Sequence, residues 1–347
     1  MGILQFDYTH NCRISRFRWI VNEVVSENPM KKNVIVFLLL SVFTGSVYSQ
    51  FDAQLSQYML HNSSFNPAAV GESGMIDIIG QHRINWLNFT GGGSTTAFSI
   101  NAPIKIENTV HGLGLSFLDD KFGGFTNTAF HLQYAYKKNI GPGKFSVGAD
   151  IGFVSIGFSG DSVALHAINI GEYHNMTSDP AIPLSNVNGM GLNLNVGVWY
   201  SMNNWYGGAS YLHLNQPKVK WGNSTEFALF SSLFLTGGLS YKLQDPKYVL
   251  KPSALFKSDF SSWQLDLSAR LEYDNRFWGG LSYRYQDAVV FMGGLNIAGG
   301  LSLGYSFDLS TSKLITTNYG SHELVLIYSF EYVFSKSLSK YKSIRFM

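Results

Sequence analysis

Segments of about ten residues that alternate large apolar side chains with small or polar ones recur along most of this chain. Residues 301–308, LSLGYSFD, place Leu, Leu, Tyr and Phe at odd positions and Ser, Gly, Ser and Asp at even positions. The same alternation runs through residues 263–271 and 191–199. Successive side chains of a β-strand point to opposite faces, so each segment predicts a strand with one apolar face.

The composition indicates what the apolar faces meet. Only 14% of the residues are charged, against roughly 25% in typical soluble domains. The face opposite the apolar one carries mainly Gly, Ser and Asn, whereas a water-exposed surface would carry more Lys and Glu. No apolar run reaches the roughly 18 residues that a membrane-spanning helix requires. These features favour an all-β transmembrane antiparallel barrel, with a secreted soluble β-sandwich array as the alternative fold.

The turn residues divide the chain into about 14 predicted strands, an even number as in bacterial single-chain barrels. With the N-terminus in the periplasm, short turns follow the even-numbered strands, and the longest connections, 160–188, 214–227 and 309–320, follow odd-numbered ones. Short periplasmic turns and long external loops are typical of outer-membrane barrels. The predicted strands lie at 75–86, 94–102, 110–118, 125–138, 144–159, 189–201, 204–213, 228–242, 247–257, 262–272, 277–285, 287–295, 298–308 and 321–332.

Aromatic residues gather near the predicted strand ends and indicate girdles at the two membrane interfaces. The last strand alternates Leu324, Leu326, Tyr328 and Phe330. We expect Tyr328 and Phe330 to supply the terminal aromatic strand that barrel-assembly machinery recognises. The girdle residues are Trp86, Phe89, Trp199, Tyr200, Trp205, Tyr206, Trp221, Phe277 and Trp278.

Residues 30–49 have the pattern of a secretory signal peptide. Lys31 and Lys32 precede an apolar stretch at 34–47, and Ser49 is a small residue before Gln50. We therefore expect cleavage between Ser49 and Gln50. Translation is expected to start at Met30, with residues 1–29 as an upstream extension. The remaining chain divides into an N-terminal periplasmic segment at 50–73, a barrel at 74–334 and a basic tail at 335–347.

Cleavage would remove the chain's single cysteine, Cys12, and leave equal numbers of acidic and basic residues. No basic footprint for nucleic acid remains. The histidines lack metal-ligand spacing, and Gly160-Asp161-Ser162 resembles a lipase nucleophile block without its partner Asp and His. We predict no catalytic, cofactor-binding or metal-binding residue, a neutral and uncharged lumen, and a protein that is not an enzyme. His322-Glu323 is interpreted as a loop-to-strand junction, because adjacent strand residues face opposite sides.

Several short motifs follow one another along the chain: QLSQYM at 54–59, NPAAVG at 66–71, WGGLSYR at 278–284, DAV at 287–289, GYSFD at 304–308, SKL at 312–314 and GSHEL at 320–324. In this order they resemble the PorP/SprF family of Bacteroidetes outer-membrane proteins. The resemblance covers the whole chain after residue 50. It implies a role in type IX secretion or gliding motility, contact with periplasmic ring proteins, and a client with a C-terminal secretion domain, such as a gliding adhesin.

Two roles remain open for the N-terminal segment. It can plug or brace the barrel, or it can dock periplasmic partners through Tyr58, Asn66 and Pro67. For the whole chain, the alternatives to a secretion accessory are a passive porin or hydrophobic-solute transporter, and an outer-membrane enzyme. A porin should show a charged constricting loop, and loop 160–188 carries few charges.

Overall fold

The computed structural model describes residues 52–107, 109–160, 185–221 and 225–331. The predictions for residues 1–29, for the signal peptide at 30–49 with its cleavage between Ser49 and Gln50, and for the tail at 335–347 lie outside the described residues. Most of the predicted loop 160–188 also lies outside them. Within the described part of the chain, no helix is long and apolar enough to span a bilayer.

Short 3₁₀ helices precede a long series of antiparallel strands. The helices are η1 (Tyr58–Leu60), η2 (Asn62–Ser64), η3 (Pro67–Ala69) and, near the end, η5 (Lys313–Thr316). The strands are β1 (Ile76–Ile84), β2 (Ser94–Ile106), β3 (Thr109–Phe122), β4 (Phe125–Ile140), β5 (Gly143–Phe158), β6 (Val187–Ser201), β7 (Trp205–Leu212), β8 (Lys218–Trp221), β9 (Thr225–Ala228), β10 (Ser232–Leu239), β11 (Tyr241–Lys242), β12 (Tyr248–Ser258), β13 (Trp263–Tyr273), β14 (Phe277–Arg284), β15 (Ala288–Ile297), β16 (Leu301–Ser310) and β17 (Ser321–Phe330).

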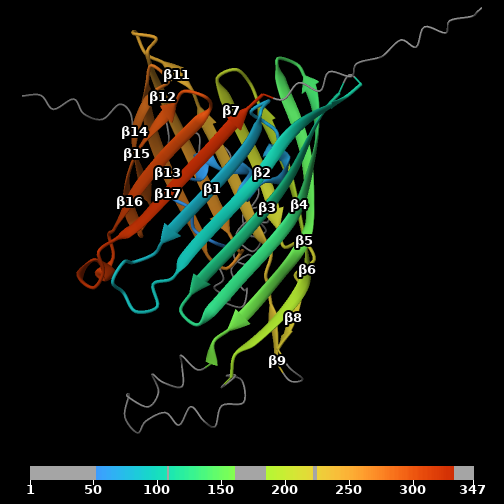
Figure 1. Cartoon of the computed structure of the whole chain (residues 1–347), viewed down its shortest axis with the longest axis vertical. Coiled ribbons are helices and arrows are strands. Elements are labelled where there is room, and N and C mark those ends of the chain that lie inside the picture. Colours follow the sequence, from blue (N-terminus) through green and yellow to red (C-terminus); the bar gives the residue numbers. More distant parts are fainter. Residues whose placement is uncertain (1–51, 108, 161–184, 222–224, 332–347) are drawn as a thin grey trace, which may run out of the picture. The chain divides into compact units, whose positions relative to one another are not determined.

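The strands close into a barrel (Figure 1). Neighbours in sequence pair in antiparallel register around the wall, and β1 pairs with β17, with Gly80 opposite Leu326. Both β10 and the two-residue β11 pair with β12, and Ser240 alone separates them. They therefore form one interrupted wall strand, and the wall has 14 strand positions. The predicted all-β barrel of about 14 strands is confirmed.

The predicted alternation sets the two faces of the wall. On β16, Tyr305 is 47% exposed on the outer face, whereas Ser306 and Asp308 are buried inside. Leu192 and Asn193 on β6 point outward and inward in the same way. The outer face presents large apolar side chains along every long wall strand, as an outer-membrane barrel requires.

One end of the barrel carries short turns, and the other end carries the longest connections. Turns of a few residues follow β2, β4, β6, β11, β13 and β15, whereas the connections after β1, β5, β7 and β16 are longer. We call these the short-turn end and the long-loop end. By the convention of outer-membrane barrels, they face the periplasm and the exterior, respectively.

The connection after β7 contains a hairpin that the sequence prediction missed. Predicted loop 214–227 holds β8 and most of β9, which form a separate two-stranded sheet. Val219 and Trp221 are buried against Val154 and Ile156 of β5, and the Trp221 indole N–H donates to the Ile156 carbonyl at 2.9 Å. Apolar contact with the wall therefore orders part of a connection that looked like a loop.

Part of the predicted aromatic girdle is wrong. Trp199, Trp221 and Trp278 are buried, and Trp199 stacks on Tyr206 with ring centroids 5.0 Å apart. Trp205 and Phe277 do lie on the exposed outer face. Neighbouring residues at a strand end alternate between the two faces, so a cluster of aromatics supplies the interior as well as the interface.

Candidate functional site

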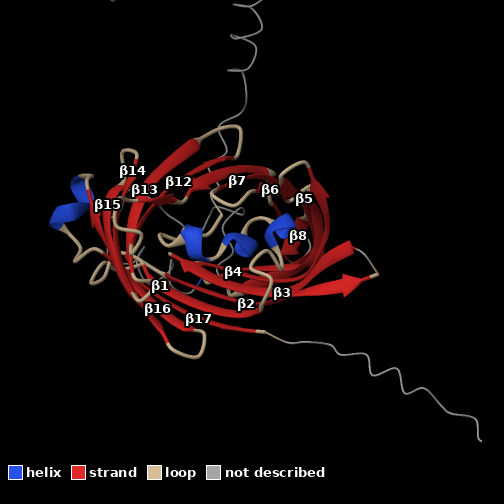
Figure 2. Cartoon of the chain, turned by 90° about the horizontal axis from the view of Figure 1, so that it is seen from above, coloured by secondary structure: helices blue, strands red, loops and turns tan. Residues whose placement is uncertain are grey.

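The lumen of the barrel is occupied by the chain's own N-terminal segment. Viewed along the barrel, the ring of strands surrounds the short helices of this segment (Figure 2). Residues 52–72 run from the long-loop end to the short-turn end, where β1 begins. We call residues 52–72 the plug. Its buried side chains include both apolar and polar types: Leu55, Ser56, Gln57, Tyr58, His61, Ser63, Phe65, Asn66, Ala68, Ala69 and Val70.

At the long-loop end, Asp308 on β16 lies at the centre of a buried charge network. Its carboxylate contacts the guanidinium groups of Arg83 at 2.8 Å and Arg284 at 3.1 Å. Ser56 of the plug donates its hydroxyl to Asp308 at 2.6 Å and accepts from Arg83 and Arg284 at 2.7 and 2.9 Å. One plug hydroxyl thus bonds all three wall side chains.

Glu323 on β17 binds the plug backbone on the short-turn side of this network, because Asp308 pairs with Ser321 and Ser306 pairs with Glu323. The backbone N–H groups of Ser56 and Gln57 donate to its two carboxylate oxygens at 2.7 and 2.8 Å. The side-chain amide of Gln81 donates to Glu323 at 2.8 Å, and Arg83 lies 3.6 Å away. Charge-assisted bonds of this kind are stronger than neutral ones, so Glu323 is a principal anchor of the plug.

Arg284 on β14 completes the charged anchor. Its guanidinium contacts Asp266 at 3.1 Å and Asp287 at 3.2 Å in addition to Asp308. Removing one partner of a buried ion pair typically costs 3–5 kcal/mol, roughly, because the other charge is left without compensation. We refer to these wall residues together as the charged anchor: Arg83, Asp266, Arg284, Asp308 and Glu323.

The first residues of the plug contact two further wall groups. Asp52 lies 2.8 Å from the His213 ring nitrogen Nε2, and Lys257 donates to Gln54 and to the Asp52 carbonyl. Burial alone would raise the pKa of Asp52, but the charge of His213 and its hydrogen bond hold that pKa below its ordinary value. Burial would likewise lower the pKa of His213, but the Asp52 carboxylate outweighs it and raises that pKa.

At the short-turn end, the wall receives the plug through shape. A Cβ atom on Gly148 of β5 would lie 2.4 Å from the Ala68 nitrogen, and one on Gly197 of β6 would lie 2.2 Å from Asn66 Oδ1. On Gly112 it would lie 2.1 Å from the Val70 carbonyl oxygen. These contacts are far inside van der Waals distance, so only glycine leaves room for the plug. We call the wall glycines Gly112, Gly148 and Gly197 the glycine cradle.

Asn66 fixes the plug backbone within the cradle. Its side-chain oxygen accepts from the Ala68 N–H at 2.9 Å and caps η3, which has Pro67 at its first position. Its side-chain amide donates to the carbonyls of Val198 and Ala209 at 3.1 and 3.3 Å. The Asn-Pro pair therefore starts a 3₁₀ turn and ties it to two wall strands.

Midway along the plug, His61 is buried between two wall side chains. Nδ1 lies 3.1 Å from the Gln81 oxygen, and Nε2 lies 2.7 Å from the Ser99 hydroxyl. Desolvation by burial lowers the pKa of His61 to about 4, although the bond to Gln81 acts in the opposite direction. The ring is therefore neutral near pH 7.

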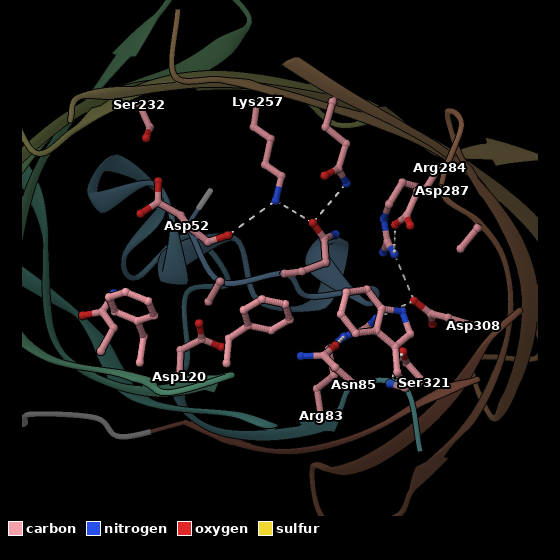
Figure 3. A pocket seen from close by; sticks show the side chains of 18 of the residues that line it. Asp52, Arg83, Asn85, Asp120, Ser232, Lys257, Arg284, Asp287, Asp308 and Ser321 are labelled. Carbon is pink, nitrogen blue, oxygen red and sulfur yellow. Dashed lines mark hydrogen bonds and ion pairs between the residues drawn. The ribbon is translucent and has the colours of Figure 1, made fainter. Parts of the chain in front are cut away.

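Above the plug, a cavity of about 770 Å³ opens at the long-loop end. Three residues of the charged anchor, Arg83, Arg284 and Asp308, form part of its lining (Figure 3). Its volume lies in the roughly 300–1,000 Å³ range of ligand-sized pockets. We call this cavity the vestibule. Its aromatic lining residues are Trp86, Phe122, Phe125, Phe227, Phe230, Trp263 and Tyr285.

The structure places the predicted partner-contact residues inside the lumen. Tyr58 and Asn66 are each 1% exposed, and Pro67 is also buried. Their contact with a periplasmic partner remains a prediction and would require the plug to leave the barrel. Tyr328 lies 43% exposed on the outer face of β17, beside Phe330 with ring centroids 5.3 Å apart. Their recognition by assembly machinery remains a prediction.

The prediction of an uncharged lumen is wrong. The charged anchor is inward-facing and almost fully buried, and Lys137 at the short-turn end bonds the Ala68 carbonyl and Glu72 of the plug. A net charge of zero is consistent with either no lumenal charges or paired ones, and the sequence does not distinguish these cases. The sequence did contain a sign of lumenal charges: Arg284 and Asp308 occupy inward-facing positions in the alternating pattern of their strands. Among the described residues, no cluster of potential metal ligands is present.

The closed wall and its internal segment define an outer-membrane-type β-barrel with an N-terminal plug. A family model described as "Type IX secretion system membrane protein PorP/SprF" matches residues 47–328. The chain belongs to the PorP/SprF family, and the resemblance seen in the sequence is confirmed.

Comparison with solved structures finds barrels of other kinds. The CymD monoaromatic hydrocarbon channel is 13% identical over 84% of this chain and 97% of that chain, with a TM-score of 0.42. The toluene transporter TodX of P. putida is 12% identical over 75% and 89%, with a TM-score of 0.37. The translocator domain of autotransporter NalP from Neisseria meningitidis is 17% identical over 74% and 88%, with a TM-score of 0.36. No curated protein matches the chain.

Proposed function

We propose that this chain is a non-enzymatic outer-membrane component or accessory of the type IX secretion system. In this role it supports the secretion or surface display of a client that carries a C-terminal secretion domain, such as a gliding adhesin. It reaches the outer membrane through a cleaved signal peptide and contacts the periplasmic ring proteins. Membership of the PorP/SprF family supports the association with type IX secretion.

The observation that carries this proposal is the occupied lumen. The plug is bonded to the charged anchor at one end and fitted into the glycine cradle at the other. A passive porin requires a continuous water-filled path, and the plug lies across that path. A barrel filled in this way instead offers a rigid scaffold with one surface at each side of the membrane.

The two ends suggest different partners. At the long-loop end, a partner would meet the vestibule, with its aromatic lining, and the β8–β9 hairpin in addition to the loops. Loops on a rigid scaffold vary without cost to the fold, so recognition of a particular client belongs at this end. The short-turn end faces the periplasm in the proposed orientation, and contact with the ring proteins belongs there.

Deletion of the gene tests the proposal. We expect one or a few large proteins to disappear from the cell surface, while uptake of small solutes is unchanged. Surface proteomics and solute-uptake assays measure the two outcomes on the same cells. If deletion changes only small-solute uptake, the porin or solute-transporter alternative is correct.

A loop exchange locates the client contact. Loop 160–188 is replaced by an Asn-Gly turn, and the short turn at 202–204 is replaced in the same way as a control at the opposite end. Both variants should assemble, as judged by heat-modifiable migration on gels, but only the loop 160–188 variant should lose client display. Normal display by that variant would place the client contact elsewhere.

A further inference from the structure

A second charged group lies at the short-turn end, away from the charged anchor. Arg270 lies on β13 with its guanidinium carbon 5.1 Å from the ring centroid of Trp278. Its Nε is buried and has no hydrogen-bond partner. Arg284, on the next strand, is bonded to Asp266, Asp287 and Asp308. Arg270 is half-buried and Arg284 is buried, and the two arginines differ in how their charge is compensated.

The one acidic side chain that follows Arg270 on β13 is engaged by another cation. Glu272 follows two residues later on the same face of β13, and its Oε2 contacts Lys251 Nζ at 2.5 Å. Within the described part of the chain, no ion pair or hydrogen bond joins Arg270 to a carboxylate. The face of Trp278 attracts the cation but supplies no hydrogen-bond acceptor.

Arg270 borders a cavity of about 170 Å³ beneath the plug. Leu60 of the plug, Lys251, Glu272 and Trp278 also line it. Asn275, in the turn between β13 and β14, places the cavity at the short-turn end. At about 30 Å³ per water molecule, the space holds about five or six waters, enough for a carboxylate group and its first carbons.

The buried Nε–H of Arg270 has no acceptor, and the two cations that line the cavity, Lys251 and Arg270, outnumber its one carboxylate, Glu272. A buried donor without an acceptor is costly. The planar fork of arginine matches a carboxylate, which can accept two parallel N–H bonds. We infer that the Arg270 cavity binds a carboxylate of a periplasmic polypeptide, with Trp278 and Lys251 as flanking groups. The carboxylate is a C-terminus or an acidic side chain. The claim that the carboxylate approaches from the periplasm rests on the orientation given under the proposed function. The claim that the cavity binds a carboxylate does not depend on that orientation.

Binding to the purified full-length barrel in detergent tests the inference. The probes are three fluorescent hexapeptides: one with a free C-terminus and no acidic side chain, its C-terminal amide, and an amidated peptide with a central Glu. Inorganic phosphate is tested as a competitor. We expect at least one carboxylate-bearing peptide to bind at least about tenfold more tightly than the neutral amide. Preference between the first and third peptides distinguishes a C-terminus from an acidic side chain.

Three variants connect the binding to Arg270. R270Q should weaken carboxylate binding by about tenfold or more, and R270K should weaken it less because the charge remains. R276Q is the matched control, because Arg276 lies in the turn at the same end with its side chain 72% exposed. R276Q should change the affinity by less than about twofold. Heat-modifiable gel migration confirms that each variant is folded, and R270K keeps the test informative if R270Q does not fold.

Several results would overturn the inference. Equal binding of the acidic and amidated peptides would show that the carboxylate is not recognised. An equal loss in R270Q and R276Q would show general electrostatic attraction to the short-turn end. Phosphate that binds at Arg270 more tightly than every peptide would indicate a site for a free anion instead of a polypeptide.

Discussion

The two ends of the plug are held by different physical means. At the long-loop end, Ser56 and Gln57 bond to buried carboxylates and guanidinium groups on four wall strands. At the short-turn end, Asn66 and Ala68 lie in space that wall glycines leave open. The first end depends on charge compensation, and the second depends on the absence of side chains.

This difference predicts different responses to substitution and solution conditions. Loss of a buried charge leaves its partners without compensation, whereas a new methyl group in the cradle creates a steric clash. If the two ends are independent, each change should loosen only its own half of the plug. Amide hydrogen exchange, measured separately for residues 54–60 and 66–71, reports on the two halves.

The largest effect is expected at the charged anchor. Arg284→Met leaves Asp266 and Asp308 without one of their cations and should lower the free energy of unfolding by about 3–5 kcal/mol. Exchange should accelerate at 54–60 and remain slow at 66–71. Urea unfolding in lipid vesicles measures the stability, and the exposed Arg276→Met serves as control. Equal loss of protection in both halves would refute the independence of the ends.

The middle of the plug should make the protein sensitive to acid through His61. The folded-state pKa of His61 is lowered by burial to about 4, against about 6.5 in the unfolded chain. The unfolded chain therefore takes up a proton first, and stability falls by up to ~3 kcal/mol as the pH drops from 6.5 to 4. Urea unfolding at several pH values should show this loss in the wild type and a smaller loss in His61→Gln. An equal loss in both would exclude His61 as its cause.

A smaller effect is expected in the glycine cradle. Gly148→Ala places a methyl group against Ala68 and should cost about 1–3 kcal/mol. Gly80→Ala is the matched control, because nothing lies within 4 Å of a Cβ at that position. Exchange should accelerate at 66–71 in Gly148→Ala only. Similar stability losses in the two variants would mean that strand effects, and not the cradle, dominate.

The smallest of these effects concerns the cap in the cradle. Asn66→Ala removes the cap of η3 and the two bonds to wall carbonyls, with an expected cost of about 1–2 kcal/mol. Residues 54–60, at the long-loop end, should keep their protection against amide exchange. Faster exchange confined to 54–60 would contradict the assignment of Asn66 to the short-turn end.

The sequence predicted the wall well because the wall obeys a local rule. Alternation with a period of two identifies each strand and its faces without reference to any other strand, as on β16 and β6. The missed β8–β9 hairpin is stabilised by Val219 and Trp221 packing on β5. That contact joins residues far apart in sequence, so a local pattern does not contain it.

The site was less predictable because its bonds span almost the whole chain. Ser56 and Glu323 are separated by 267 residues. The recognised motifs nevertheless contained the anchoring residues, since Ser56, Arg284, Asp308 and Glu323 each fall within one of them. The family resemblance therefore marked the positions that meet in the lumen, but it supplied neither their pairing nor their burial.

The plug has a consequence for how the barrel is made. Its partners include β1, the first strand of the wall to leave the ribosome, and β17, the last. The seam between β1 and β17 closes the wall around the plug. A plug that is in place before the seam forms does not have to thread through a closed lumen. Until then, Asp308 and Glu323 lack the serine hydroxyl and backbone N–H groups that they bind in the finished protein. We therefore expect the wall to close around the plug, and a defect in the plug should appear first as slow seam closure during assembly.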